Sequence, residues 1–164
     1  MSTATSTTTY TRTHTATYLS DVIMGAIGDI LALLGITPSD AARWDLDERA
    51  IAAWIEEQSL DTVVLECHRP SGTVRPIFEF PVTYDVDGVG QFENSQAAMS
   101  RYLAKLSSVP AGTTYTLFCS FRKMRTPQDG WSPGVRSSTA GLHSTSFGSL
   151  AEAPQARASM RHLR

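Results

Sequence analysis

The chain has 164 residues, of which 41% are hydrophobic and 18% are charged. This length and composition can bury the core of one globular domain, which excludes an intrinsically disordered chain. The formal net charge of −2 removes the simplest argument for a nucleic-acid-binding protein, and the longest apolar run is too short to span a membrane, so we expect a soluble protein.

The N-terminal segment is rich in threonine, which accounts for nine of the first seventeen residues. The segment has no apolar periodicity and cannot bury enough surface to offset its ordering entropy. Residues 1–13 are therefore predicted to form a flexible arm. No basic region followed by an apolar stretch is present, which argues against a secretory signal.

A long helix is predicted next, because apolar residues recur at steps of three and four from Leu19 to Leu34 and Gly35 follows. Gly25 and Gly28 inside this helix cost about 1 kcal/mol each relative to alanine. Close packing against that face of the helix would offset the cost. We expect this to be the central helix of the domain.

A second, shorter helix is predicted from about Asp47 to Gln58, since Asp45 and Glu48 resemble a capping box. A third helix is predicted to be capped by Asn94 or Ser95 and to end at Ser107.

A β hairpin is predicted between these two helices, with arms over residues 62–69 and 74–86. Pro76 and Pro81 cannot donate to a strand ladder, so the second arm is predicted to be an edge or to carry a bulge. Three residues are predicted to break it: Asp87, Gly88 and Gly90.

A further strand is predicted at residues 115–122, where apolar and mixed side chains alternate. After Met124 the periodicity fades, and no long regular element is predicted in the last forty residues. Segments of that kind are typically functional or mobile.

Charge is distributed unevenly along the chain. Residues 1–121 contain seven basic and fourteen acidic side chains, whereas residues 122–164 contain seven and two, giving −7 and +5. We expect the basic tail to be attracted to its own acidic body over roughly 8 Å in physiological salt. A nucleic-acid-binding arm is the alternative, but its basic residues are sparse and interrupted.

The sequence contains no catalytic or metal-binding motif. The four histidines are isolated, and neither HExxH nor GxSxG occurs. No enzymatic activity, cofactor or metal ion is therefore expected. Cys67 and Cys119 lie in strand-like runs 52 positions apart, which favours buried structural thiols in a reducing cytoplasm.

Several blocks of the sequence resemble one protein family. They read PIFEFPVTYDV, NSQAAMSRYLAKLSSV, TTYTLFCSFRKMRTP and STSFGSLAEAPQARASMRHL, with a lone Trp131 before the last block. In this order they resemble the HORMA domain of spindle-checkpoint and meiotic-axis proteins, and the opening residues are similar to the first helix of its bacterial members. The resemblance implies an α+β class, the HORMA fold, in which three helices pack on a central antiparallel sheet with a hairpin. It also divides the single domain into an arm (1–13), a core (14–134) and a C-terminal safety belt (135–164).

In this family the safety belt closes over a short closure-motif peptide and pairs again with the sheet, which is strand addition. The resemblance implies that the receiving edge lies near Trp131–Val135. The implied peptide-binding residues are Trp131, Ser132, Gly134 and Val135, and the implied belt anchors are Ser146, Phe147 and Met160. For Trp131, a hydrophobic plug over the core is an equal alternative.

The bacterial branch implies a role in anti-phage signalling of the CBASS type. The peptide-bound form would activate a cGAS/DncV-like nucleotidyltransferase, and an AAA+ remodelling ATPase would reopen it. The ATPase would engage the arm at Thr8, Thr9 and Tyr10, although an ordinary disordered terminus is as good an interpretation.

No membrane or direct nucleic-acid partner is expected. The alternative is a structural or oligomerising interaction module without a switch, in which the tail is only a covering strand.

Overall fold

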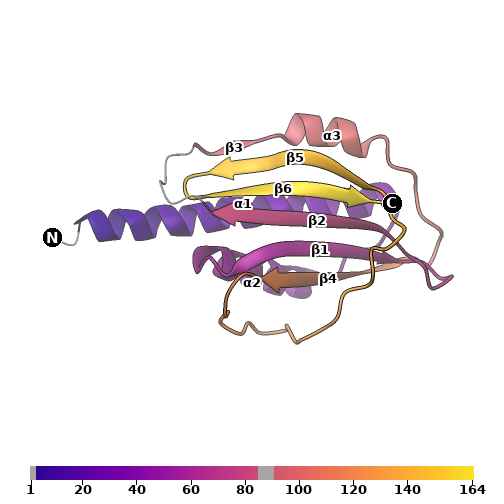
Figure 1. Cartoon of the computed structure of the whole chain (residues 1–164), viewed down its shortest axis with the longest axis horizontal. Coiled ribbons are helices and arrows are strands. Elements are labelled where there is room, and N and C mark those ends of the chain that lie inside the picture. Colours follow the sequence, from indigo (N-terminus) through magenta and orange to yellow (C-terminus); the bar gives the residue numbers. More distant parts are fainter. Residues whose placement is uncertain (1–2, 85–90) are drawn as a thin grey trace.

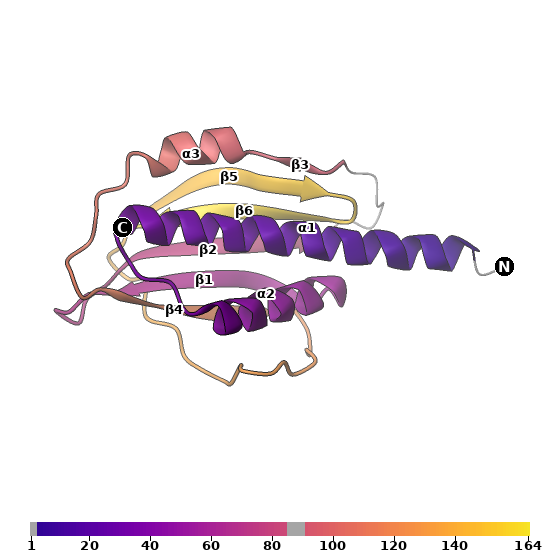
Figure 2. The ribbon, with the colours of Figure 1, turned by 180° about the vertical axis from the view of Figure 1, so that it is seen from behind.

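The computed structural model describes residues 3–84 and 91–164, with side chains from Thr11 onward. Over these residues the chain forms three helices and six strands: α1 (Thr3–Leu34), α2 (Ala41–Glu56), β1 (Leu60–His68), β2 (Val74–Tyr84), β3 (Glu93–Asn94), α3 (Gln96–Leu103), β4 (Thr114–Phe121), β5 (Ser144–Ala153) and β6 (Ala156–Leu163). The strands form one antiparallel sheet in the order β3-β5-β6-β2-β1-β4. Helices α1 and α2 cover one face of the sheet, and α3 lies along β5 (Figures 1 and 2). The predicted α+β class is confirmed.

Helix α1 is the central helix, as predicted. Leu19, Ile23, Ile27 and Ile30 are fully buried against the sheet and the other helices, which is the apolar stripe read from the sequence. Figure 2 shows the helix running past the end of the sheet towards the N-terminus.

The segment predicted as a flexible arm is helical from Thr3 onward. Its last residue is held to the body, because Thr13 Oγ1 donates to Glu56 at 2.7 Å, and just after the arm Thr15 Oγ1 donates to the Pro154 carbonyl at 2.6 Å. The flexibility of the arm stays a prediction, and residues 1–2 lie outside the described residues.

Residues 11–34 of α1 are long and apolar enough to cross a membrane by length and composition alone, and half of the 18-residue window that meets this test is buried inside the protein. Burial of this kind is what the core helix of a globular domain shows. Of the two glycines in α1, only Gly28 has a close neighbour: a Cβ there would lie 3.6 Å from the Trp44 ring, whereas one at Gly25 would meet nothing within 4 Å.

Helix α2 begins earlier than predicted. Its N-cap is Asp40, whose carboxylate accepts from the Arg43 N–H at 2.8 Å, so the predicted capping box at Asp45 and Glu48 does not start it. An aspartate after Pro38 and Ser39 supplies the same cap chemistry one turn upstream. Helix α3 ends at Leu103, before the predicted Ser107. Of the two predicted caps, Asn94 Oδ1 accepts from the Gln96 N–H at 3.2 Å, whereas the Ser95 side chain makes no capping hydrogen bond.

The hairpin β1–β2 is confirmed, but β2 is not an edge strand. It lies between β1 and β6, and its pairing with β6 omits Phe80 and Pro81, where Pro81 has no N–H to donate. The irregularity in the β1–β2 pairing falls between Glu66 and His68. The predicted breakers Asp87, Gly88 and Gly90 lie outside the described residues.

The local sequence pattern did not predict strands β5 and β6, since no long regular element was predicted after Met124; only the family resemblance implied that this region pairs with the sheet. The two strands pair with each other as a hairpin, and β6 also pairs with β2. The inward-facing residues of β6 include Ala156, Ala158 and Met160, all buried in the main core. Small alanine side chains give too weak a hydropathic alternation for the strand to be recognised in the sequence.

The other face of the sheet carries a smaller apolar cluster. Val64, Ile77 and Leu163 are buried there, and Phe118 and Leu142 pack against them. We call this the outer face, because α1 and α2 cover the opposite one (Figures 1 and 2). Leu142 belongs to the irregular segment between β4 and β5, so that segment covers part of the outer face.

Candidate functional site

Strand β4 has one free edge. It pairs with β1 on one side from Thr114 to Phe121, and no strand of the described residues pairs with its other side. The main-chain N–H and C=O groups along a free edge can accept another extended chain. Eight residues of β4 provide room for a peptide segment of similar length.

The irregular residues 122–143, which we call the crossing segment, run past this edge and over the outer face to β5 (Figure 1). A groove of about 640 Å³ lies between the crossing segment and β4. It is lined by residues of α2, β4 and the crossing segment: Arg43, Trp54, Thr116–Cys119, Phe121, Arg125, Pro127, Gln128 and Gly130–Gly134. A second cavity of about 540 Å³ continues along the first half of β4 and shares Arg43, Thr116 and Leu117 with the groove.

Aromatic side chains close the groove on the α2 side. The rings of Trp54 and Trp131 meet edge to face at 5.2 Å, and Trp54 also meets Phe121 at 4.8 Å. The Trp131 indole N–H is buried and has no hydrogen-bond partner among the described residues. The groove therefore combines an apolar wall with a hydrogen-bond donor that is available to a ligand, a combination typical of binding pockets.

Arg43 connects α2 to the crossing segment. Its Nη1 donates to the Gly130 carbonyl at 2.6 Å, its Nε lies 3.0 Å from Asp47 Oδ1, and its guanidinium lies 5.7 Å from the Trp131 ring centre. Burial raises the pKa of Asp47, and the Arg43 charge opposes that rise. This arginine fixes the position of Gly130, whose φ of +81° suits glycine.

The start of the crossing segment is tied to the end of α2. Thr126 donates its N–H and its hydroxyl to the two oxygens of Glu57 at 3.0 and 2.8 Å, and Trp54 Nε1 donates to the Thr126 carbonyl at 2.8 Å. Burial of Glu57 would raise its pKa, but hydrogen bonds from Ser59 and Thr126 outweigh it and lower the pKa.

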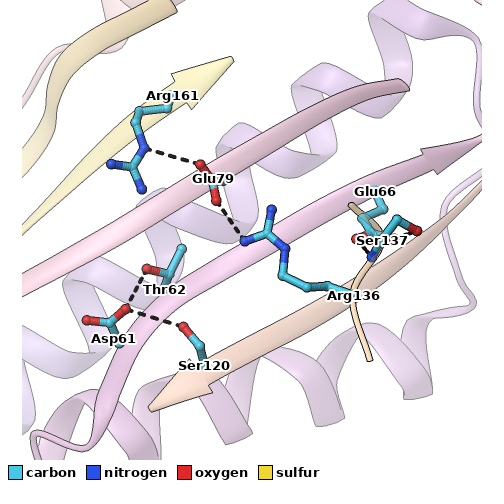
Figure 3. A network of polar contacts seen from close by, with 8 residues as sticks. All are labelled: Asp61, Thr62, Glu66, Glu79, Ser120, Arg136, Ser137 and Arg161. Atoms are coloured by element: carbon cyan, nitrogen blue, oxygen red, sulfur yellow. Dashed lines mark hydrogen bonds and ion pairs between the residues drawn. The ribbon is translucent and has the colours of Figure 1, made fainter. Parts of the chain in front are cut away.

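The later part of the crossing segment is tied to acidic residues on the outer face (Figure 3). Arg136 Nη1 lies 2.7 Å from Glu79 Oε2, and Ser137 donates its N–H and hydroxyl to Glu66 at 2.7 and 3.0 Å. Glu66 is fully buried. The sequence predicted an attraction between the basic tail and the acidic body, and the ion pair between Arg136 and Glu79 is one such contact.

Three of the four residues implied as peptide-binding do line the groove. Trp131, Ser132 and Gly134 stand on the wall opposite β4, whereas Val135 is 92% exposed and does not line it. The edge that can receive a peptide is β4, which faces residues 130–134 across the groove, so the expectation of an edge near residues 131–135 fits the structure, while its use by a peptide stays a prediction. Those residues form no strand, so they cannot offer a ladder of hydrogen bonds.

The residues implied as belt anchors lie on the hairpin β5–β6. Met160 is fully buried in the main core, Phe147 packs edge to face on Tyr102 at 5.7 Å, and Ser146 is exposed. Their role as anchors stays a prediction. The irregular part of the C-terminal region begins at residue 122, earlier than the implied boundary at residue 135. The implied ATPase contacts Thr8, Thr9 and Tyr10 belong to α1, and their side chains lie outside the described ones.

Sequence patterns did not reveal the residues that hold the crossing segment. Arg43, Glu57, Glu66 and Glu79 read as ordinary helix or strand residues, because their partners lie 57 to 87 positions away in the chain. The only available signal was the opposite charge of the two parts of the chain. Over the part that the structure describes, no three His, Cys, Asp or Glu side chains gather as metal ligands would.

A model of the family described as bacterial HORMA domain 2 matches residues 4–164. The chain belongs to this family. No curated protein matches it in sequence.

Solved HORMA structures share the fold at low sequence identity. A chain from the mitotic checkpoint complex superposes with a TM-score of 0.75 at 13% identity, over 91% of this chain and 97% of that chain. C. elegans HTP-2 bound to the HIM-3 closure motif gives 0.65 at 14%, over 88% and 87% of the two chains. A chain of the E. coli MS115-1 HORMA:CdnC:Trip13 complex gives 0.63 at 9%, over 93% and 89%.

Proposed function

We propose that this HORMA domain is a peptide-binding signalling adaptor. A closure-motif peptide lies as an added strand beside β4 and beneath the crossing segment, and the domain changes between an open and a closed state as the peptide leaves and binds. The observation that carries this proposal is the free edge of β4 facing a groove of about 640 Å³ under a segment that is tied at both ends.

In this proposal, two parts of the site have separate roles: β4 provides the affinity for the peptide, and the crossing segment slows its release. Main-chain hydrogen bonds to β4 supply affinity with little dependence on sequence, while side-chain pockets supply specificity. Arg43, Glu57 and Glu79 hold the crossing segment over the groove. A peptide in the groove is released only when some of these ties break, which slows its dissociation.

The partners are proposed from the family. Similarity to a chain of the E. coli HORMA:CdnC:Trip13 complex supports a cGAS/DncV-like nucleotidyltransferase as the enzyme that the peptide-bound form activates. The same similarity supports an AAA+ remodelling ATPase that opens the domain through the N-terminal part of α1. We place this signalling in anti-phage defence in the bacterial cytoplasm, and we assign the domain no catalytic step of its own.

A display library of random peptides tests the binding step directly. Enriched peptides are expected to bind the purified chain saturably, and Ser132→Trp, which fills the groove, is expected to weaken them at least about tenfold, the equivalent of about 1.4 kcal/mol. Val135→Trp is the matched control on the same segment, since Val135 points into solvent and should leave affinity unchanged.

Two results would contradict the proposal. If no peptide is enriched, the chain is a structural or oligomerising module; if both tryptophan variants bind equally well, the peptide lies elsewhere. For the signalling step, an enriched peptide is expected to raise the rate of a cGAS/DncV-like nucleotidyltransferase from the same genome only when the chain is present.

A further inference from the structure

A basic pocket lies at one end of the sheet, apart from the groove beside β4. It has a volume of about 230 Å³, and four chain segments contribute to it: the end of α1, the β1–β2 turn, the residues after α3 and the end of β6. Figures 1 and 2 both show the turn, the segment after α3 and the C-terminus at this end of the sheet. The pocket shares no lining residue with the groove.

Four cations line this pocket: Arg69, Arg75, Lys105 and Arg164. No aspartate or glutamate is among its lining residues. Over residues 3–84 and 91–164, none of the four side chains lies within ion-pair distance of a carboxylate, whereas Arg43, Arg136, Arg157 and Arg161 all do. The side chains that line the pocket therefore carry an excess of positive charge, in a chain whose net charge is −2.

The lining also supplies oriented donors. Arg69 Nε donates to the Arg75 carbonyl at 3.0 Å, which fixes the guanidinium across the turn, and its other N–H groups make no hydrogen bond to a described residue. Ser107 and Ser108 add two hydroxyls with no side-chain hydrogen bond among the described residues. Planar guanidinium forks together with hydroxyls match the oxygens of a phosphate group.

His162 also lines the pocket. Its ring stacks on Phe78 at 4.5 Å, and its Nδ1 lies 2.7 Å from the Tyr102 hydroxyl. Burial and the charge of Arg164 together lower the pKa of His162 to about 4. The ring is therefore neutral at pH 7 and adds no further charge to the site.

We infer that this pocket binds the phosphate group of a small phosphorylated molecule. The volume holds one phosphate with part of what it is attached to, since a drug-sized ligand needs roughly 300 Å³ or more. Arg69, Arg75, Lys105 and Arg164 neutralise the dianion, and Ser107 and Ser108 donate to its oxygens. The inference is independent of the peptide groove.

Amide NMR spectra recorded on the full chain at constant ionic strength test this inference. Inorganic phosphate, pyrophosphate and AMP are titrated separately, and saturable shifts are expected at the amides of Ser107 and Ser108. Binding is also expected to raise the pKa of His162 above its value in the free protein, because a nearby anion favours the imidazolium form. Tighter binding of AMP than of inorganic phosphate would identify a nucleotide, and equal binding would show that the phosphate alone is recognised.

Charge-removing variants make the test specific. Lys105→Gln is expected to weaken binding about tenfold, the loss of one charge-assisted hydrogen bond, and adding Arg69→Gln should weaken it further. Arg101→Gln, an exposed arginine on α3 outside the pocket, is the matched control and should bind normally. Shifts that do not saturate, or equal weakening by Arg101→Gln and Lys105→Gln, would show non-specific charge attraction and overturn the inference.

Discussion

Glu79 on β2 pairs with Arg136 of the crossing segment, with 2.7 Å between carboxylate and guanidinium. The other carboxylate oxygen lies 3.2 Å from Arg161 on β6. The Glu79 side chain is only 13% exposed, so the two pairs are partly shielded from solvent. One carboxylate therefore joins the crossing segment, the hairpin β5–β6 and the centre of the sheet, as Figure 3 shows.

Replacing this carboxylate should loosen the crossing segment without unfolding the sheet. Glu79→Gln removes both ion pairs, and we expect the opening free energy of residues 135–143 to fall by about 1 kcal/mol, the upper end for partly exposed pairs. Amide hydrogen exchange measures this locally. Glu152→Gln is the control, because its pair with Arg157 is 3.5 Å long and 46% exposed on both sides. If the amides of residues 135–143 exchange at equal rates in the two variants, Glu79 does not hold the crossing segment in place.

Stability should decrease with rising pH because of a carboxyl pair between α1 and α2. A hydrogen bond to Asp21, burial, and the charges of Asp21 and Asp45 raise the pKa of Glu48 from 4.5 to about 7. Between these two values the folded chain keeps a proton that the unfolded chain has released, so stability falls as pH rises through this range. Glu48→Gln should therefore raise the melting temperature more at pH 8 than at pH 5.

Thermal unfolding of the wild type and Glu48→Gln at the two pH values checks this. Glu93→Gln, an exposed glutamate on β3, should change the melting temperature equally little at both. A Glu48→Gln variant that is no more stable than wild type at pH 8 would mean that the two carboxyls do not share a proton.

The sequence was sufficient for elements with strong periodicity. Helix α1, the hairpin β1–β2 and strand β4 all carry large apolar residues at regular spacing, so their local pattern determines their structure. Strand β6 has alanine at the inward positions 156 and 158, and β5 has Gly148 at a break in its register with β6. These two strands exist because β2 offers them a partner, which no local pattern records.

The candidate site was predicted only in part, for a related reason. Trp131, Ser132 and Gly134 were identified through family resemblance, and they do line the groove. The free edge of β4 depends on the order of strands in the sheet, and that order is set by long-range pairing. Arg43 lies on α2 and Glu57 is its C-cap, and in the sequence a charged residue at either position is interpreted simply as part of a solvated helix surface.

Gly25 should be replaceable with a gain in stability. A Cβ there would meet no atom within 4 Å, so the expected packing benefit of glycine is absent and only its entropic cost remains. Gly25→Ala should raise the free energy of unfolding by about 1 kcal/mol, as measured by urea denaturation. Gly35→Ala is the contrasting variant, since a φ of +76° at the end of α1 makes alanine strained. Destabilisation by Gly25→Ala would indicate that the space beside it is used.

The two cysteines should react at different rates, and peptide binding should protect one of them. Cys67 is fully buried, and burial raises its pKa to about 12; Cys119 is only half-buried and lines the groove, although burial also raises its pKa. Both thiols are therefore almost entirely protonated at pH 8 and should react with iodoacetamide more slowly than free cysteine. Cys119 should still react before Cys67, because the reagent reaches it through the groove.

A peptide that adds a strand to β4 would cover Cys119 and leave the environment of Cys67 unchanged. Mass spectrometry of the chain alkylated with and without an enriched peptide should show slower labelling at Cys119 only, and Ser132→Trp, which blocks the groove, should abolish the difference made by the peptide. Equal protection of both thiols would point to a general tightening of the fold. Because the sulfur of Cys119 belongs to the strand that receives the peptide, loss of its labelling measures occupancy of the proposed site itself.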